Sequence, residues 1–303
     1  MQGLKFARGV FFGCVIAVAG QVYAQTGSAV VTVQRKAGNA DPIQQENVLV
    51  FENGKRAPIT LWAPLTGEHG GMQLLVLIDD SSASGLANQI DDVKTFILAL
   101  PSAVQVAVGY MSNGQTVMAQ PFTRDHGLAA KALRLPQSIR GGGSPYFTLS
   151  SVAQQWPGEG PTARRAVLMI TDGIDRYGDT KFNADNPYVT KAIADAQRAQ
   201  ILVYTLYYRG AGALSYDPAA SNGGQNYLVQ LSQETGGKCL YSGTGNPVSV
   251  VPFLNDLSQI LNNQYLLRFK SVAKPNKGLV QMKLKMETPG VKLVAPQMVP
   301  VTP

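Results

Sequence analysis

The stretch LLVLIDDSSASG, residues 74–85, runs from an unbroken block of apolar side chains into two acids and three serines. Three similar apolar blocks follow it: VQVAVGY (104–110), AVLMI (166–170) and ILVYTLYY (201–208). Continuous apolar runs of this length are typical of strands that are buried on both faces of a parallel sheet. Amphipathic segments separate the blocks, so we predict an α/β fold with a doubly wound, mostly parallel sheet.

The segments between the blocks have helical spacing. One apolar stripe ends before Pro101, a second helix begins at Pro187, and a third spans Tyr227 to Thr235 and ends at Gly236-Gly237. A fourth has its apolar positions at Val251, Leu254, Leu257 and Leu261. The run QTVMAQPFT (115–123) follows the previous block too closely for a crossover helix, so we expect an antiparallel edge strand there.

The two ends of the chain have a different pattern. Residues 26–37 and 46–64 alternate apolar and polar side chains around a turn at Asn53-Gly54, and the alternation returns from Tyr265 onward. We therefore predict that an N-terminal β segment (25–70) and a C-terminal β segment (265–303) form one small β module. It would flank an α/β domain that spans residues 71–264.

The first 24 residues resemble an export signal. Lys5 and Arg8 precede the apolar run GVFFGCVIAVAG, and Val22-Tyr23-Ala24 offers small residues for cleavage after Ala24. The run is shorter than the ~20 residues that span a bilayer, which disfavours a retained transmembrane anchor. Lipidation at Cys14 is the other alternative, but Phe11-Phe12-Gly13 is a poor match for it. We expect a secreted or periplasmic protein without an anchor.

Composition narrows the classes of function. The chain has 303 residues, of which 45% are hydrophobic and 15% charged, enough to bury a large core. Loss of Lys5 and Arg8 would lower the net charge from +7 to +5, and the remaining basic residues are scattered, so nucleic-acid binding is not expected. Cys239 would be the remaining cysteine, so no internal disulfide is expected. Weak contact with an anionic envelope surface is allowed by tail lysines at 270, 274, 277, 283 and 285.

Three loops carry hard oxygen donors at the edge where parallel strands end. They are DDSSAS after the first block, GGGS at 141–144 and TDGID at 171–175. Ligands of open α/β sheets bind beyond the carboxyl ends of the strands, where such loops converge. Mg²⁺ prefers oxygen ligands and takes one or two carboxylates together with waters. The loops therefore predict a site for Mg²⁺ or Mn²⁺.

The order and spacing of these loops resemble the von Willebrand factor type A domain. Its metal-ion-dependent adhesion site has Asp-x-Ser-x-Ser, a Thr in a Gly-Gly-Thr loop and an Asp in Thr-Asp-Gly. The resemblance covers residues 71–264, and the flanking FENGK (51–55) and NQYLLRF (263–269) look like bacterial secreted VWFA-related proteins of the acidobacterial type. It implies a binding module whose metal ion leaves one position open for an Asp or Glu of a protein partner.

The first loop fits the family motif in two registers. Asp79 directly follows the strand, but a motif that begins at Asp80 keeps both serines, Ser82 and Ser84. The register from Asp80 also places apolar residues at the buried positions of the next helix: Ile90, Val93, Phe96 and Ile97. We therefore favour Asp80, Ser82 and Ser84 as ligands, with Asp79 as an orienting acid or the alternative register.

The other two loops supply the remaining predicted ligands. Asp172 matches the Thr-Asp-Gly position, and Ser144 stands where the family has Thr. Pro145 and a third glycine make that loop different from the family's, so Thr148 is an alternative donor. The competing interpretation is a relic site in which these polar groups only cap strands and helices.

Enzymatic motifs are not evident in the sequence. His69 and His126 stand apart from Cys, His or Glu residues in zinc-site spacing, and neither a G-x-S-x-G elbow nor a phosphate-binding loop occurs. We interpret the chain as a binding protein whose specificity loops are 173–187 and 209–226, with contact candidates Tyr177, Phe182, Tyr188 and Tyr216. The alternative is a metal-free structural or interaction protein of the cell envelope, in contact with its neighbours through β edges.

Overall fold

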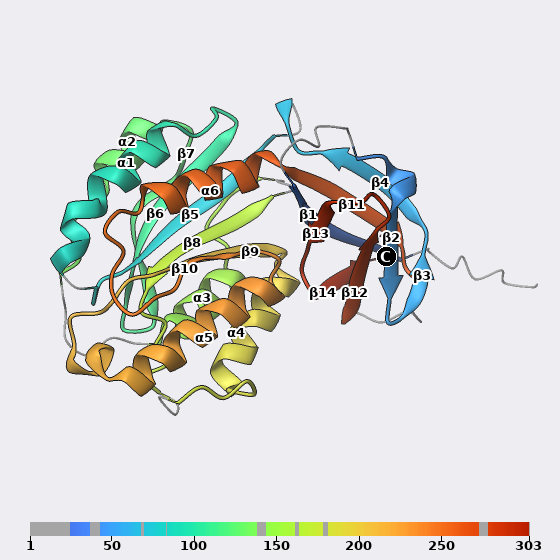
Figure 1. Cartoon of the computed structure of the whole chain (residues 1–303). Coiled ribbons are helices and arrows are strands. Elements are labelled where there is room, and N and C mark those ends of the chain that lie inside the picture. The colour runs from blue at the N-terminus through green and yellow to red at the C-terminus, as the bar shows by residue number, and fades with distance from the viewer. Residues whose placement is uncertain are drawn as a thin grey trace, which may run out of the picture.

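Two sheets organise the chain (Figure 1). The computed structural model describes residues 25–36, 43–67, 70–82, 84–137, 144–160, 164–177, 181–272 and 278–302. The middle of the sequence forms a six-stranded sheet with helices, and the two ends form an eight-stranded sheet. The predicted export signal, residues 1–24, lies outside the described residues. In the described part, no helix is long and apolar enough to cross a membrane.

The strands of the six-stranded sheet are β5 (Met72–Asp79), β6 (Val104–Ser112), β7 (Gln115–Thr123), β8 (Arg165–Thr171), β9 (Ile201–Tyr207) and β10 (Cys239–Tyr241). Their order is β10-β9-β8-β5-β6-β7, and all pairs are parallel except β6 with β7. Asn113 and Gly114, with φ of 50° and 75°, make the tight turn into β7. The predicted parallel sheet with one antiparallel edge strand is confirmed.

Six helices are described: α1 (Ile90–Leu98), α2 (His126–Lys131), α3 (Pro145–Gln154), α4 (Pro187–Arg198), α5 (Pro218–Glu234) and α6 (Val251–Asn262). α1, α2 and α6 pack on one face of the sheet, and α3, α4 and α5 pack on the other (Figure 1). Alternate residues of β5 face the two layers, with Leu74 and Val76 on one side and Leu75 and Leu77 on the other. This double burial explains the unbroken apolar block that opens the domain.

Helix α5 differs from the prediction because it begins at Pro218 instead of Tyr227. The segment predicted as a loop, 209–226, is therefore helical over its second half. Asp217 caps the helix by accepting a hydrogen bond from the backbone N–H of Ala220 at 2.8 Å. Gly224 lies in this helical half, and a Cβ there would be 2.4 Å from the carbonyl oxygen of Asp172. This glycine lets the helix approach the end of β8.

The eight-stranded sheet joins the head of the chain to its tail. Its strands are β1 (Thr26–Arg35), β2 (Val48–Glu52), β3 (Lys55–Ala57), β4 (Ile59–Pro64), β11 (Gln264–Lys270), β12 (Leu279–Met286), β13 (Val291–Val294) and β14 (Met298–Thr302). The order is β3-β2-β12-β14-β1-β11-β4, with β13 also paired to β1. The predicted head and tail module is confirmed, but an eight-stranded sheet is larger than the small module expected. Asn53-Gly54 makes the predicted turn between β2 and β3.

The eight-stranded sheet curls back on itself. Its two terminal strands, β3 and β4, are consecutive in the chain and are separated only by Pro58. The concave side encloses an apolar cluster that includes Val31, Leu267, Phe269 and Val301. Strands contributed by both ends therefore share one core.

A buried arginine joins the two sheets. Arg164 precedes β8 and donates hydrogen bonds to the carbonyl oxygens of Gly70 and Leu261. These acceptors lie just before β5 and at the end of α6, where the chain passes between the sheets. Burial lowers the pKa of Arg164 to about 10, so the group stays charged at neutral pH. The entry and exit of the α/β domain are thus fixed by one side chain.

Candidate functional site

The candidate site lies where β5, β8 and β9 end, an area that we call the carboxyl edge. The turn after β5 packs against the loop after β9: the N–H of Ala211 donates to the carbonyl oxygen of Ser81 at 2.8 Å, and Ser82 forms a bridge with Gly210. A Cβ on Gly210 would lie 2.6 Å from Asp172 Oδ2. The glycine allows three loops to converge on the acids.

Asp79 is the last residue of β5 and is buried at the centre of this edge. Its Oδ1 accepts hydrogen bonds from Ser81 N and Ser81 Oγ, at 2.9 and 2.6 Å. Its Oδ2 accepts one from Thr171 Oγ1 at 2.8 Å. Burial raises the pKa of Asp79, and the charge of nearby Asp172 raises it further. The structure therefore brings Asp79 and Asp172 together.

Asp172 is paired with Arg176. Arg176 Nη2 lies 2.7 Å from Asp172 Oδ2, and Nη1 lies 3.3 Å from Oδ1, so the guanidinium contacts both carboxylate oxygens. Ser215 Oγ donates a further hydrogen bond to Oδ2 at 2.6 Å, and the N–H of Ile174 donates to Oδ1 at 3.0 Å. The carboxylate is thus held by a cation, a hydroxyl and the backbone.

Asp80 points to different partners. Arg134 Nη1 and Nη2 lie 2.7 and 2.8 Å from its Oδ1 and Oδ2, and the N–H of Gln137 donates to Oδ1 at 2.9 Å. Arg134 also stacks on Tyr110, with its guanidinium carbon 3.7 Å from the ring centre. Burial by itself would raise the pKa of Asp80, but the hydrogen bonds from Arg134 and Gln137 hold it below its usual value. Asp80 and Asp79 are therefore directed to separate clusters.

The predicted hydroxyl ligands have varied surroundings. Ser144 is buried and caps α3, since its Oγ accepts a hydrogen bond from Tyr146 N at 3.3 Å. Thr148 Oγ1 is buried and has no hydrogen-bond partner among the described residues. Ser82 is buried next to Gly210. The side chain of Ser84 lies outside the described part of the structure.

These donors, as arranged, do not fit a divalent cation. Asp80 and Asp172 each contact an arginine through both carboxylate oxygens, and Mg²⁺ needs free oxygens. Within the described ranges, His, Cys, Asp and Glu nowhere gather in a group of at least three that could hold a metal. Metal binding by Asp80, Ser82, Ser84, Ser144 and Asp172 stays a prediction, and it would require both arginines to move.

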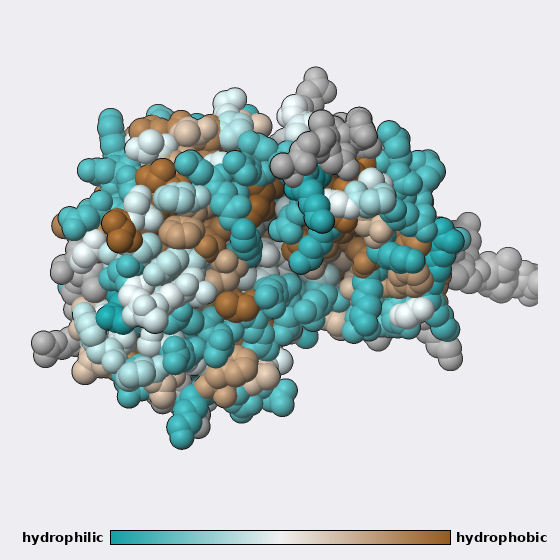
Figure 2. Space-filling view, in the orientation of Figure 1, coloured by the Kyte–Doolittle hydropathy of each residue, from teal (hydrophilic) through white to brown (hydrophobic). Residues whose placement is uncertain are grey.

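Exposed aromatic side chains surround the carboxyl edge. Tyr177 follows β8 and Tyr216 follows β9, and they are 59% and 58% exposed. Arg209 stacks on Tyr216, with its guanidinium carbon 4.8 Å from the ring centre. Of the other predicted contact residues, Phe182 is 44% exposed and packs on Tyr227, and Tyr188 packs on Phe147. On the face seen in Figure 2, hydrophobic residues form small patches among hydrophilic ones.

The three arginines of this edge were not anticipated from the sequence. Arg176 follows Asp172 by four positions, and an acid and an arginine at that spacing could have suggested a pair. Arg134 is distant in sequence from Asp80, and no local pattern links them. Arg209 directly follows the apolar block of β9, so its place at the edge could have been inferred.

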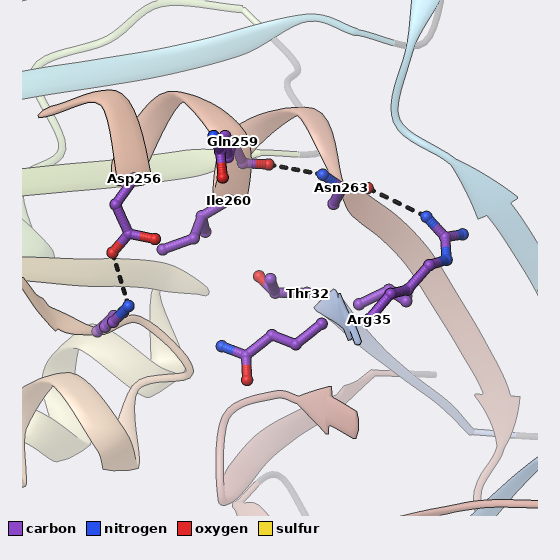
Figure 3. A pocket seen from close by; sticks show the side chains of 9 residues that line it. Thr32, Arg35, Asp256, Gln259, Ile260 and Asn263 are labelled. Carbon is purple, nitrogen blue, oxygen red and sulfur yellow. Dashed lines mark hydrogen bonds and ion pairs between the residues drawn. The ribbon is translucent and has the colours of Figure 1, made fainter. Parts of the chain in front are cut away.

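A separate hollow lies between the two sheets, away from the carboxyl edge. It has a volume of about 360 Å³ and lies between β1 and the second half of α6. Figure 3 shows the labelled residues around it: Asp256, Gln259, Ile260 and Asn263 come from the α6 region, and Thr32 and Arg35 come from β1. Its charged groups have partners in the chain, Lys238 with Asp256 and Arg35 with Asn263. We interpret it as a polar crevice.

Comparison with known proteins gives likeness of structure only. No family model and no curated protein matches the sequence. An aerotolerance-related membrane protein from Bacteroides fragilis is 15% identical, and the match covers 63% of this chain and 99% of that one with a TM-score of 0.46. BatB from Bacteroides thetaiotaomicron is 16% identical, with 63% and 97% covered and a TM-score of 0.44. The vWF domain of the type V pili tip protein Mfa5 from Porphyromonas gingivalis is 12% identical, with 63% and 95% covered and a TM-score of 0.43.

These likenesses concern the fold. The chain's own strand order, its antiparallel edge strand and its two helix layers are those that the resemblance to von Willebrand factor type A domains implies. The middle of the chain is therefore a domain of the von Willebrand factor A type in its fold. What this domain binds has to be argued from its own residues.

Proposed function

We propose that the chain is an exported binding module that recognises a protein partner through the carboxyl edge without a bound metal. The observation that carries this proposal is the exposure of Tyr177 and Tyr216 on the loops after two neighbouring strands. Tyrosine is enriched at protein interfaces and among the residues that dominate binding energy. Side chains this large and this exposed, on loops held by a rigid sheet, suit recognition.

The charge of the edge favours an acidic partner. Asp79, Asp80 and Asp172 are buried and hydrogen-bonded within the chain, whereas Arg209 lies against exposed Tyr216. An arginine stacked on an aromatic ring can receive a carboxylate and is kept in place by the ring. The resemblance to the family implies an Asp or Glu of the partner as the ligand. We propose that this carboxylate meets Arg209 instead of a metal ion.

Pull-down from envelope extract, in Mg²⁺ and in EDTA, tests the proposal. Wild type should retain the same partner in both buffers because no metal takes part. A Tyr177→Ser/Tyr216→Ser variant should lose it. The matched control is Leu98→Ser/Val117→Ser, which removes two exposed apolar side chains elsewhere. This control should bind like wild type.

The other outcomes separate the alternatives. Retention that EDTA abolishes would favour the metal-dependent site at Asp80 and Asp172 over this proposal. Loss of the partner in the Leu98→Ser/Val117→Ser control alone would move the contact to α1 or to edge strand β7, and contact through β7 is what the structural-protein alternative expects. Equal retention by all variants would show that the exposed tyrosines are not the contact.

Binding rather than catalysis is proposed for this edge. A general acid or base must be free to exchange a proton with a substrate, and the acids here accept hydrogen bonds from neighbouring residues of the chain. His126 lies elsewhere, with Nε2 2.8 Å from the carbonyl oxygen of Val104. His69 lies outside the described residues.

Export is part of the proposal and has its own test. Cleavage after Ala24 would leave Gln25 as the first residue, immediately before β1. Intact mass and N-terminal sequencing of the protein from its source cells should find this end. Retention of residues 1–24, or a lipid on Cys14, would contradict the prediction.

A further inference from the structure

Two of the buried acids at the carboxyl edge, Asp79 and Asp172, lie near the same base, Arg176. Asp79 and Asp172 are 6% and 1% exposed, and the side chain of Arg176 is 16% exposed. The acids are close enough for their charges to act on each other, and Arg176 interacts electrostatically with both. Two like charges in a poorly solvated site repel each other strongly unless a cation compensates them.

Arg176 is well placed to be that cation. It contacts both oxygens of Asp172, and its Nη1 lies 3.3 Å from the carbonyl oxygen of Ile174 within the same turn. Gly173, with φ of 69°, and buried Ile174 shape the turn between Asp172 and Arg176. The guanidinium is therefore held in place by a short segment and not by a long flexible loop.

We propose that the Arg176 guanidinium takes the place of a divalent cation at the carboxyl edge and makes the charge balance of this edge independent of metal. An arginine remains charged at all physiological pH values and cannot be removed by a chelator. The proposal concerns the interior of the edge, so it does not depend on which partner the exposed tyrosines bind.

The oxygen atoms around the two carboxylates support the inference. Besides the two carboxylates, Ser81 Oγ and Thr171 Oγ1 donate to Asp79, and Ser215 Oγ donates to Asp172. These donors come from the turn after β5, the end of β8 and the segment after β9, and Mg²⁺ and Mn²⁺ are held by such sets of carboxylate and neutral oxygens. Removal of the guanidinium would leave hard oxygen ligands without a positive charge.

The test is a gain of metal binding. Mn²⁺ binding to the full chain is measured by calorimetry and by electron paramagnetic resonance for wild type, Arg176→Ala and Arg176→Lys. We expect Arg176→Ala to bind Mn²⁺ at concentrations at which wild type binds none, and its melting temperature should rise on addition of Mn²⁺. Arg176→Lys keeps a positive charge and should bind no Mn²⁺.

Two control variants locate the acquired site. Arg134→Ala uncovers the single carboxylate of Asp80 and should not gain Mn²⁺ binding. Arg176→Ala/Asp79→Asn removes one of the two proposed carboxylates and should lose most of the binding that Arg176→Ala gains. Equal binding by Arg176→Ala and Arg134→Ala would mean that any uncovered acid suffices, which would overturn the inference.

Each of the remaining outcomes also supports or overturns the inference. Wild type that binds Mn²⁺ through Asp172 would show that Arg176 does not replace the ion. If Arg176→Ala does not fold, refolding is compared with and without Mn²⁺, and Arg176→Gln is examined in the same way. Folding that requires Mn²⁺ would support the inference. Absence of Mn²⁺ binding by both folded variants, or misfolding of both that Mn²⁺ does not correct, would overturn it.

Discussion

The hydroxyl of Tyr146 is a single group that fixes the loop of the candidate site. It is fully buried on α3 and donates a hydrogen bond to the carbonyl oxygen of Gly173 at 2.6 Å. Burial raises the pKa of Tyr146 well above its usual value, so the hydroxyl keeps its proton. Tyr146→Phe should lower the free energy of unfolding by about 1–3 kcal/mol, because a buried carbonyl loses its donor.

Urea unfolding measures this cost against a matched variant. Tyr241→Phe removes a hydroxyl that donates to the carbonyl oxygen of Gly245 at 2.9 Å in a half-buried position. There water can replace the lost donor, so the expected change is within about 0.5 kcal/mol. If Tyr146→Phe costs no more than Tyr241→Phe, the buried hydrogen bond does not stabilise the loop.

Gly173 is required for a second reason, the approach of α5. Its φ is +69°, and a Cβ would lie 2.6 Å from the carbonyl oxygen of Gly224 and 2.5 Å from Leu228 Cγ. Gly173→Ala should therefore combine backbone strain of about 1–2 kcal/mol with a steric clash of about 1–3 kcal/mol. Thermal and urea unfolding would measure the sum.

Gly54→Ala measures the backbone strain without the steric clash. Gly54 also has positive φ, +80°, but a Cβ there would meet nothing within 4 Å. We expect this variant to show the backbone strain alone, about 1–2 kcal/mol. An equal loss of unfolding free energy in Gly173→Ala and Gly54→Ala would mean that α5 moves to accommodate the Cβ. Close packing would then not be the reason for the glycine at 173.

Residue identities alone could not place the charged partners of the acids. Asp172 and Asp79 could be assigned to the carboxyl edge because each directly follows or ends a buried strand. The choice between Asp79 and Asp80 depends on where a side chain points after the strand ends. That direction is set by Ser81, which lies two residues after Asp79, and by Thr171 and Arg134, which come from distant parts of the chain. The contacts with Thr171 and Arg134 have no local sequence signal.

At the scale of elements, Asp195 joins two helices. It lies on α4 and accepts hydrogen bonds from Ser150 Oγ and Gln154 Nε2 on α3, at 2.5 and 2.9 Å. Burial by itself would raise the pKa of Asp195, but hydrogen bonds from Lys191, Ser150 and Gln154 hold it below its usual value of 3.8. The ionised carboxylate thus stabilises the helix pair.

Asp195→Asn should destabilise the protein in a manner that depends on pH. A lowered pKa means that the stabilisation is fully present above pH 3.8 and is lost as the pH falls through the pKa of the folded state. We expect a loss of about 1–2 kcal/mol at pH 7, since the cationic partners are half exposed. The difference from wild type should shrink when urea unfolding is repeated at increasingly acid pH below 3.8.

Asp91→Asn is the control for this pair. Asp91 and Lys94 form an ion pair on α1 with side chains 88% and 37% exposed. Exposed pairs contribute little, so this variant should match wild type at every pH. A loss at Asp195 that does not diminish in acid would mean that the asparagine disturbs packing and that the carboxylate charge is not responsible.

Helix phase predicted one element correctly but could not decide the ligand register. Ile90, Val93, Phe96 and Ile97 are the buried residues of α1, as the register from Asp80 predicted. The 3-10 helix Ser84–Gln89 lies between the strand and α1. A turn and a 3-10 helix need not contain the same number of residues as in a related domain. The spacing of the buried residues therefore identifies helix α1, but it does not decide whether Asp79 or Asp80 starts the ligand motif.

At the scale of the molecule, the two ends of the chain depend on each other. β12 pairs with β2 over five residue pairs, from Met282↔Glu52 to Met286↔Val48, whereas β4 pairs with β11. Deletion of residues 272–303 should therefore increase hydrogen exchange at the amides of β2 and leave those of β4 protected. Mass spectrometry of peptides from both strands would measure the difference.

Amides of β5 and β8 control for general unfolding because their neighbours all lie in the six-stranded sheet. They should keep their protection in the deletion variant. Protection of β2 that equals wild type would contradict the shared sheet. The head and tail alternation predicted such a sheet from sequence, but its size and order could not be predicted, since strand partners more than 200 residues apart leave no local pattern.

The curled sheet also determines when its strands can pair as the chain is synthesised. β1 emerges early, but its partners β11, β13 and β14 all lie after residue 263. Among the described strands before residue 65, β2 and β3 pair with each other, while β4 waits for β11. Meanwhile the apolar side chains of Val31 and Val33 stay open to other nascent chains. A chaperone that covers the first strands until the last ones are translated would therefore act at the step where this protein is most exposed to aggregation.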